Sequence, residues 1–271
     1  QYQQYANLTK YNDEMERKDL FDVVQVRGID ALPFLHSQCA ADLMPLADGQ
    51  LRWSALLSPQ GRVQFVVAVI RESSDAWWLL VPFERGNALV ATLRRFVFRR
   101  KVAIEINVDK AVLATETGLD TGIDGIRLAL VDRGSAPAAL TPDALDRFIS
   151  AGLSLIDEVA ADRHLAHSLR LERFDAYSVK KGCYPGQEIV ARTHFLGRNK
   201  RVLVRLAADP VVVWHSGDKV YVDGTEIGEI ACAGLVGALA VLTQPVEPGH
   251  SLQLGTDRLV VMVADVIAGA S

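Results

Sequence analysis

The stretch VKKGCYPGQEIVAR, residues 179–192, is the most informative part of the chain. Gly182 and Gly186 permit backbone conformations that a side chain would obstruct, which predicts a tight turn. The residues from Gln187 to Phe195 have the composition of a two-turn helix, which Gly197 would end. The side chains between the two glycines are therefore expected to lie just ahead of a helix N-terminus.

Cys183 occupies that place, with Lys180 and Lys181 directly upstream. Exposed N–H groups, the positive end of the helix dipole and two ammonium groups all favour the thiolate over the thiol. A free cysteine is more often a small core residue, but the flanking glycines, proline and charges predict a surface turn. We therefore expect an accessible thiol that readily loses its proton. Glu188 and Arg192 are four residues apart and could pair on one helical face.

Residues 181–188, KGCYPGQE, resemble a long and specific family signature, K-G-C-[FY]-x-G-Q-E. This signature is typical of the YgfZ family, folate-binding proteins that are related to the T-protein (aminomethyltransferase) of glycine cleavage. Weaker similarities follow in the family's order and extend over nearly the whole chain. They are VRGIDA (26–31) with FL (34–35), Asp42, LSPQGR (57–62), RFISAG (147–152), VAR (190–192) and GRNKR (197–201).

The resemblance implies a fold, a ligand and a setting. The fold would be α+β: a folate-binding region of two parts, residues 1–197, and a C-terminal all-β barrel, residues 198–271, around a central channel. The ligand would be tetrahydrofolate or a one-carbon derivative. The setting would be the assembly or repair of iron–sulfur enzymes, which supports tRNA methylthiolation indirectly. The protein partners would be iron–sulfur enzymes or assembly factors.

The signature also implies site residues. Cys183 would face the folate cavity as the catalytic thiol, and Lys181 would favour its thiolate. Gln187, Glu188 and Arg192 would shape the helix. The residues carried over from the signature and its continuation are Lys181, Gly182, Cys183, Tyr184, Gly186, Gln187, Glu188 and Arg192.

Two departures from the family concern chemistry and the pterin pocket. T-proteins have a catalytic aspartate where this chain reads VPFERGNAL (81–89), and Glu84 is the only nearby acid. This argues against aminomethyl transfer, although a folate-dependent one-carbon transferase remains the alternative. A family tryptophan near the first strand falls on or next to Phe21, whose ring could stack on the pterin. A second family tryptophan has no match near Ala144.

The pattern along the chain agrees with an α+β front and an all-β tail. In the front, strands and helices occur in an order that does not alternate regularly. The expected elements are strands at 21–26, 53–57, 62–70, 77–81, 102–108, 111–115 and 126–131, and helices from Asp30, at 84–98 and at 141–151. In the tail, Asp223-Gly224 is a strong two-residue hairpin signal. The expected barrel strands are 200–206, 219–222, 225–230, 235–243, 251–254 and 259–263.

Composition narrows the class of protein. The chain has 271 residues, is 49% hydrophobic and 23% charged, and has a net charge of −4, which excludes a disordered or collagen-like chain. Three scattered cysteines do not suggest disulfides, so we expect a reducing, cytoplasmic location. Cys39 and Cys232 are expected to be packing residues. No apolar run reaches membrane-spanning length and no signal peptide is visible, so no membrane partner is expected.

Because the net charge is negative, binding to nucleic acid would need a local basic patch. The densest one contains Arg94, Arg95, Arg99, Arg100 and Lys101. It could contact RNA or the folate tail, or it could simply complement the C-terminal end of a helix. Phe96 and Phe98 fit the core face of that helix.

The remaining candidates point to packing. The six histidines show no metal-ligand spacing, and His164-x-x-His167 is expected to be solvated or capping, so no metal site is predicted. Trp77 and Trp78 are expected to place one ring inside the protein and one outside.

Overall fold

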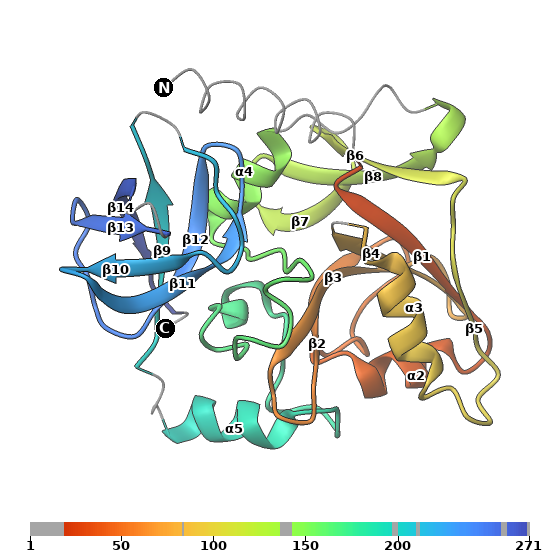
Figure 1. The fold of residues 1–271 in the computed structure, drawn as a ribbon. Coiled ribbons are helices and arrows are strands. Elements are labelled where there is room, and N and C mark those ends of the chain that lie inside the picture. Colours follow the sequence, from red (N-terminus) through yellow and green to blue (C-terminus); the bar gives the residue numbers. More distant parts are fainter. Residues whose placement is uncertain are drawn as a thin grey trace.

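The computed structural model describes residues 19–82, 84–135, 143–196, 200–209, 212–255 and 259–269. These residues form an α+β region followed by a closed β-barrel (Figure 1). The predicted fold class is therefore confirmed. The expected division after residue 197 and the expected helix start at Thr141-Pro142 lie outside the described residues.

The front of the chain is a five-stranded antiparallel sheet in the order β2-β3-β4-β1-β5. Its elements are β1 (Phe21–Arg27), α2 (Ala31–Gln38), β2 (Leu51–Leu57), β3 (Val63–Arg71), β4 (Ala76–Pro82), α3 (Gly86–Arg94) and β5 (Ala103–Ile106). The two helices pack on one face of this sheet, and the rest of the protein covers the other. Both faces are therefore buried.

This double coverage corrects one expectation. Trp77 and Trp78 do lie on opposite faces of β4, but they expose only 0% and 5% of their surface. The prediction of an outward-facing ring is wrong, because the sheet has no solvent-exposed face at this position.

A second, three-stranded sheet has the order β6-β8-β7. Its strands are β6 (Lys110–Thr115), β7 (Leu119–Ile123) and β8 (Ile126–Asp132). Short helices and an irregular segment then lead to the barrel. The helices are η1 (Arg133–Ser135), α4 (Asp143–Ala151), η2 (Leu171–Phe174) and α5 (Gln187–Leu196). The sequence predicts β6 and β8 but not β7.

The tail closes into a barrel in the order β10-β11-β12-β9-β14-β13. Its strands are β9 (Val202–Ala207), β10 (Lys219–Val222), β11 (Thr225–Ala233), β12 (Gly237–Leu242), β13 (Ser251–Leu254) and β14 (Leu259–Ile267), which confirms all six predicted strands within a few residues. The hairpin turn between β10 and β11 has φ values of 48° at Asp223 and 79° at Gly224. Positive φ at both positions is what a tight two-residue hairpin turn requires.

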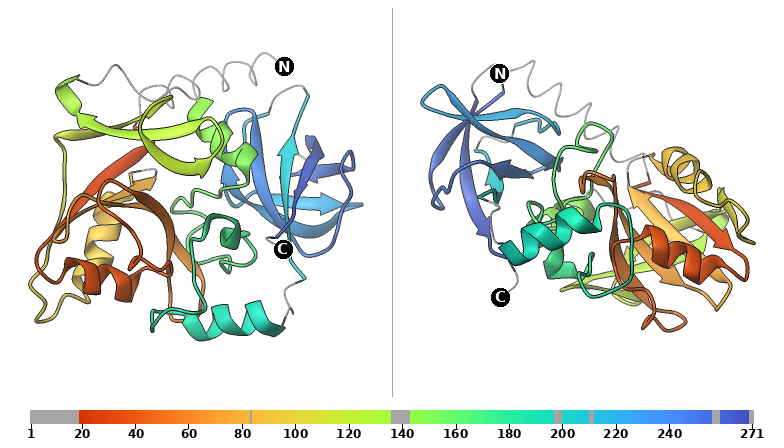
Figure 2. Two further views of the ribbon diagram at one scale, coloured as in Figure 1. Left: turned by 180° about the vertical axis from the view of Figure 1, so that it is seen from behind. Right: turned by 90° about the horizontal axis from the view of Figure 1, so that it is seen from below.

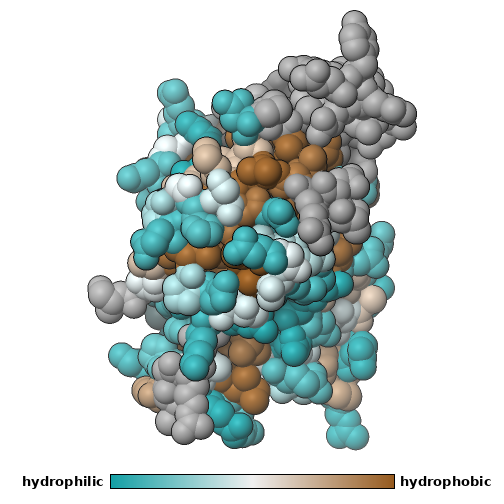
Figure 3. All heavy atoms as spheres, turned by 60° about the vertical axis from the view of Figure 1, so that its left-hand side comes forward, coloured by the Kyte–Doolittle hydropathy of each residue, from teal (hydrophilic) through white to brown (hydrophobic). Residues whose placement is uncertain are grey.

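One apolar core joins these parts. It contains Phe148 of α4, Tyr184 ahead of α5, and Leu203 and Leu239 of the barrel, together with one face of the first sheet. Figures 1 and 2 show α5 along one edge of the molecule, beneath both the sheet and the barrel. The side that carries the barrel is mostly hydrophilic, with hydrophobic side chains visible between the polar ones (Figure 3). In the described part of the chain, every helix is too short or too polar to cross a membrane.

Candidate functional site

The residues ahead of α5 form a loop that is tied to the rest of the protein at several points. We call residues 178–186 the motif loop. The Ser178 N–H donates to the carbonyl of Ala40 at 2.9 Å, and the Tyr184 hydroxyl donates to the Ser178 carbonyl at 2.9 Å. The Gln187 side chain donates to the Lys181 carbonyl at 3.1 Å. Burial raises the pKa of Tyr184 to about 12, so its hydroxyl keeps the proton that this bond needs.

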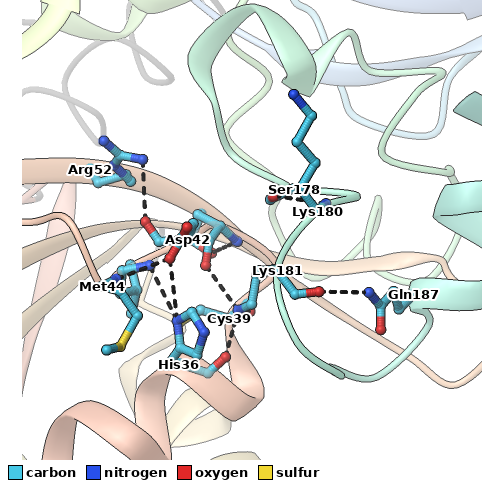
Figure 4. A network of polar contacts seen from close by, with 12 residues as sticks. His36, Cys39, Asp42, Met44, Arg52, Ser178, Lys180, Lys181 and Gln187 are labelled. Atoms are coloured by element: carbon cyan, nitrogen blue, oxygen red, sulfur yellow. Dashed lines mark hydrogen bonds and ion pairs between the residues drawn. The ribbon is translucent and has the colours of Figure 1, made fainter.

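Lys181 is the strongest of these anchors. Its Nζ donates to the carbonyls of His36, Cys39 at 2.6 Å and Ala41 at 2.9 Å, which we call the carbonyl cage (Figure 4). The ammonium also lies 5.1 Å from the ring centroid of Tyr184. The three carbonyls use all three ammonium protons.

The cage lies where α2 ends, and this explains its composition. The last carbonyls of a helix have no partner inside the helix, and they carry the negative end of its dipole. His36 is in the last turn of α2, and the other two carbonyls follow directly. Lys181 therefore caps α2. Burial lowers the pKa of the Lys181 ammonium to about 8, although Cys39 and Asp42 oppose the shift.

This geometry gives Lys181 a role that the sequence did not predict. Its ammonium is bound to the carbonyl cage, so it holds the loop in place. Lys180 is exposed and extends away from the cage (Figure 4). The signature lysine is therefore a positioning residue.

The three cysteines differ as the sequence indicates. Cys183 is exposed, whereas Cys39 and Cys232 are buried, which confirms their predicted packing role. Burial raises the pKa of Cys39 to about 11 and that of Cys232 to about 12, so both stay thiols near neutral pH. The exposed Cys183 lies between two buried residues, Lys181 and Tyr184. The loop thus presents its thiol to solvent from a fixed backbone.

Two glycines let the motif loop pack against the turn between β2 and β3. Gly186 has a φ of +77°, and a Cβ there would lie 2.6 Å from the Ser58 carbonyl oxygen and 2.7 Å from Gly61 Cα. Gly61 has a φ of +73°, and its Cβ would lie 2.6 Å from Ile189 Cβ on α5. The LSPQGR and KGCYPGQE segments, which are far apart in the sequence, therefore contact each other in the fold.

Gly182 behaves differently from Gly186. A Cβ at Gly182 would meet no atom within 4 Å, and the residue does not have a positive φ. The expectation that this position must be glycine to form the turn is wrong, because neither space nor backbone conformation requires it.

A charged cavity of about 550 Å³ lies beside the same hairpin turn. Arg62, the residue after Gly61, lines it, and its side chain reaches the carbonyl of Arg163. The cavity separates the irregular segment before η2 from the barrel. Its charged and polar lining consists of Arg62, Asp162, Arg163, His164, Ser168, Arg201, Lys219, Glu226, Glu229 and Thr243.

Ion pairs order this cavity. Glu229 accepts from Arg163 at 2.9 Å and from Lys219 at 2.8 Å. Burial acts to raise the pKa of Glu229, but the hydrogen bond from Lys219 and the charge of Arg163 hold it below its usual value. Burial lowers the pKa of His164 to about 4, against the pull of Glu229, so this ring is neutral near pH 7. The expected solvated or capping role of His164 is therefore wrong.

Sequence reasoning missed this cavity for a physical reason. Its residues come from a hairpin, an irregular segment and three barrel strands, and only the fold brings them together. Arg62 lay within a recognised segment, but Lys219 and Glu229 are ordinary residues of predicted strands. His164 and His167 are both partly or fully buried, and no group of three or more potential metal ligands occurs among the residues that the structure describes.

The segment after β4 carries an arginine in the interior. Glu84, the only acid in residues 81–89, is exposed and has a φ of 57°, and the Asp22 carboxylate from β1 accepts from the Gly86 N–H at 2.7 Å. Arg85 is 8% exposed and donates to the carbonyls of Gln64 at 2.6 Å and Ile156 at 3.3 Å. Its guanidinium lies 4.2 Å from the ring centroid of Phe65. The buried group at this place is therefore a cation.

Phe21 does not offer a face for a pterin. It is fully buried, with ring centroids 6.5 Å from Trp53 and 6.0 Å from Phe148. Trp53 and Phe148 in turn meet edge to face at 5.7 Å. The expectation of stacking on Phe21 is corrected, because neighbouring aromatic side chains take up the space beside its ring.

The expected pair on α5 forms at the surface. Arg192 Nη2 lies 2.8 Å from Glu188 Oε1, and the two side chains are 60% and 81% exposed. Such an exposed pair stabilises a protein by about 0.5 kcal/mol or less. It does not contact the carbonyl cage or the charged cavity in the described residues. Gly197 and the next two residues of GRNKR lie outside the described residues, whereas Arg201 lines the charged cavity.

No family model matches the chain. The tRNA-modifying protein YgfZ of Enterobacter sp. (strain 638) is 24% identical over 240 residues, which cover 74% of this chain and 73% of that protein. The mitochondrial iron–sulfur cluster assembly factor IBA57 homolog of Mycosarcoma maydis is 28% identical over 220 residues, covering 68% of this chain and 55% of that protein. The crystal structure of glycine cleavage system aminomethyltransferase T from Bartonella henselae has a TM-score of 0.61 at 13% identity, over 94% of this chain and 88% of that chain. The chain therefore has the aminomethyltransferase T fold.

Proposed function

Because the chain belongs to the YgfZ family, we propose that it is a tetrahydrofolate-binding accessory protein for iron–sulfur enzymes. In this role it would support tRNA methylthiolation indirectly. One observation carries the proposal. Cys183 is exposed and lies between two buried anchors, Lys181 and Tyr184. Its loop packs against the turn between β2 and β3. Arg62, which follows Gly61 of that turn, lines the charged cavity.

The charged cavity suits the anionic end of a folate. Folates carry carboxylates on their glutamate tail, and arginine and lysine bind carboxylates through charge-assisted hydrogen bonds. Basic residues, namely Arg62, Arg163, Arg201 and Lys219, outnumber the acidic ones, which are Asp162, Glu226 and Glu229. A volume of about 550 Å³ lies within the range of small-molecule sites. We assign the glutamate tail to this cavity.

Calorimetric titration with 5-formyltetrahydrofolate tests this assignment. We expect Arg62→Ala and Lys219→Ala to weaken binding by about tenfold each, because each removes a charged partner for a carboxylate. Arg127→Ala, an exposed arginine on β8, is the matched control and should bind as the wild type does. Wild-type protein that binds no folate would overturn the folate proposal. Binding that neither cavity variant weakens would place the folate elsewhere.

The thiol is tested separately. In a strain that lacks this protein, Cys183→Ala should fail to restore the activity of iron–sulfur enzymes. Because Cys183 is exposed, this substitution should leave the free energy of unfolding within about 0.5 kcal/mol of the wild type. Full rescue by the Cys183→Ala variant would remove the thiol from the proposed function.

Aminomethyl transfer is not part of this proposal. That reaction needs an acid or base beside the folate, and the buried group after β4 is Arg85. Glu84, the acid nearest in sequence to the T-protein position, is exposed, and the Asp22 carboxylate is held by the Gly86 N–H. Assays of one-carbon transfer from methylated amines to tetrahydrofolate should therefore detect no turnover, and a measurable rate that Glu84→Gln abolishes would restore the transferase alternative.

A further inference from the structure

The loop between α3 and β5 carries a dense run of basic residues that the proposed function leaves unused. We call residues 95–101 the basic loop; Figure 1 shows it beside α2. Arg94, the last residue of α3, donates twice to the Ile104 carbonyl, at 3.1 and 2.7 Å. Arg100 donates to the Pro33 carbonyl at 2.9 Å and to Ser37 Oγ at 3.0 Å. These two arginines hold the loop against its neighbours.

The other three cations of the basic loop do not hold it against its neighbours. The side chains of Arg95, Arg99 and Lys101 are exposed, and none makes a hydrogen bond or ion pair to a residue that the structure describes. The basic cluster is therefore of two kinds. Two arginines fix the backbone, and three cations point to solvent.

Phe98 lies among these three cations and is unusual in both its exposure and its backbone conformation. It is 85% exposed and has a φ of 45°, in the left-handed region that a bulky residue rarely adopts. The sequence placed Phe98 on the core face of a helix, but α3 ends at Arg94, so that expectation is wrong. Both the exposed ring and the backbone strain are unfavourable in the free protein, and such features gather at binding sites.

The basic loop is also fixed in shape. The Arg100 N–H donates to the Val97 carbonyl at 2.9 Å, and the Lys101 N–H donates to Asp30 Oδ2 at 2.6 Å. A Cβ on Gly28 would lie 2.0 Å from the Lys101 carbonyl oxygen, so only glycine lets the two segments meet. This contact places Ile29, which is 70% exposed, next to the loop. A fixed loop loses little conformational entropy when it binds a partner.

We propose that the basic loop binds RNA with unpaired bases. Phe98 would stack on a base, and Arg95, Arg99 and Lys101 would contact phosphates. The hollow beside Phe98, about 520 Å³ and lined by Asp30, Pro33, Phe98, Arg99 and Arg100, is shallow. The carboxylates of an acidic peptide gain nothing from the exposed ring of Phe98, whereas a flat base can stack on its open face. An RNA with unpaired bases therefore complements both the positive charge of the loop and the exposed ring of Phe98.

Fluorescence anisotropy with a labelled single-stranded RNA of about 12 nucleotides tests the proposal on the full chain. The wild type should bind, and its affinity should fall by about tenfold or more when salt rises from about 50 mM to about 200 mM. Arg95→Ser combined with Arg99→Ser should weaken binding by about tenfold, and Phe98→Ala by about fivefold. All three side chains are exposed, so folding is checked simply by circular dichroism.

Two variants and one competitor make the result decisive. Phe195→Ala, a 72% exposed phenylalanine on α5, and Arg127→Ser on β8 should leave RNA binding unchanged. No RNA binding at the lower salt would overturn the proposal, as would binding that the loop variants do not weaken. Polyglutamate that binds as tightly as RNA, and is equally insensitive to Phe98→Ala, would assign the loop to an acidic protein instead. None of these outcomes depends on folate binding.

Discussion

The motif loop and the basic loop are both short, charged segments that turn at a residue with positive φ, but they use their residues in opposite ways. In the motif loop the left-handed residue is Gly186, and the cation Lys181 is buried against carbonyls. In the basic loop the left-handed residue is Phe98, and three cations are exposed. The first loop is built with little strain around one exposed thiol. The second contains a strained residue, and the side chains of its three exposed cations make no hydrogen bond or ion pair with the rest of the described protein.

Removing the buried cation should have the largest effect. Lys181→Ala leaves three carbonyls without their donor, so we expect the free energy of unfolding to fall by about 2–4 kcal/mol. Urea denaturation followed by fluorescence measures this change. The same variant should also lose iron–sulfur enzyme rescue, because Cys183 would no longer be held in place.

Lys180→Ala is the matched control for this variant. Lys180 is exposed one residue earlier, so its removal should change stability by less than about 0.5 kcal/mol. If the two substitutions had equal effects on stability, the contrast between buried and exposed cations would be contradicted. The contacts of Lys181 with the carbonyl cage would then contribute no more than an ordinary surface lysine does.

The sequence predicted much of the architecture, because local patterns carry it. Alternating apolar residues and the Asp223-Gly224 turn sufficed for the barrel strands, since both features act over a few residues. The helix that begins within the signature also starts at the predicted residue, Gln187. Strand β7 was missed because its sequence, LDTGI, contains a glycine and an aspartate, which strands disfavour.

The contacts of the candidate site could not be predicted in the same way. Lys181 meets carbonyls that lie 140 to 145 residues earlier in the chain, and no local pattern indicates such a partner. Phe21 was assigned to a ligand, but Trp53 and Phe148 come together around it only in the fold. The prediction for Phe98 was wrong for the opposite reason. The apolar spacing of the sequence continues to Phe98, although the helix ends at Arg94.

The two signature glycines give the next largest contrast. Gly186→Ala would force a Cβ against backbone atoms of the β2–β3 turn at a positive φ, which should cost about 2–3 kcal/mol. Gly182→Ala has open space and an ordinary φ, so its effect should stay within about 0.5 kcal/mol. Thermal and urea unfolding of the two variants measure the difference. A Gly182→Ala variant as unstable as Gly186→Ala would show that the motif loop is packed differently.

The pH dependence of stability tests whether burial dominates at Lys181. Its pKa is about 8 in the folded protein, below the 10.5 of a free lysine, so the unfolded chain binds more protons between these values. Stability should therefore rise with pH in this window relative to Lys181→Met, by about 1 kcal/mol per pH unit at most. Paired urea titrations at pH 7 and at pH values above 8 measure the difference. A fall instead of a rise would mean that the carbonyl cage outweighs burial.

The smallest effect concerns the strained residue of the basic loop. Asparagine adopts the left-handed region more readily than other residues with a side chain, so Phe98→Asn should be more stable than Phe98→Ala by about 0.5–1 kcal/mol. Both variants remove the same exposed ring, and their difference in urea unfolding therefore reports the backbone alone. If Phe98→Asn also exceeds the wild type in stability while losing RNA affinity, then the phenylalanine is kept at this position at a cost to the fold. Equal stability of the asparagine and alanine variants would show that the backbone at Phe98 is relaxed, and the contrast with Gly186 would then rest on charge alone.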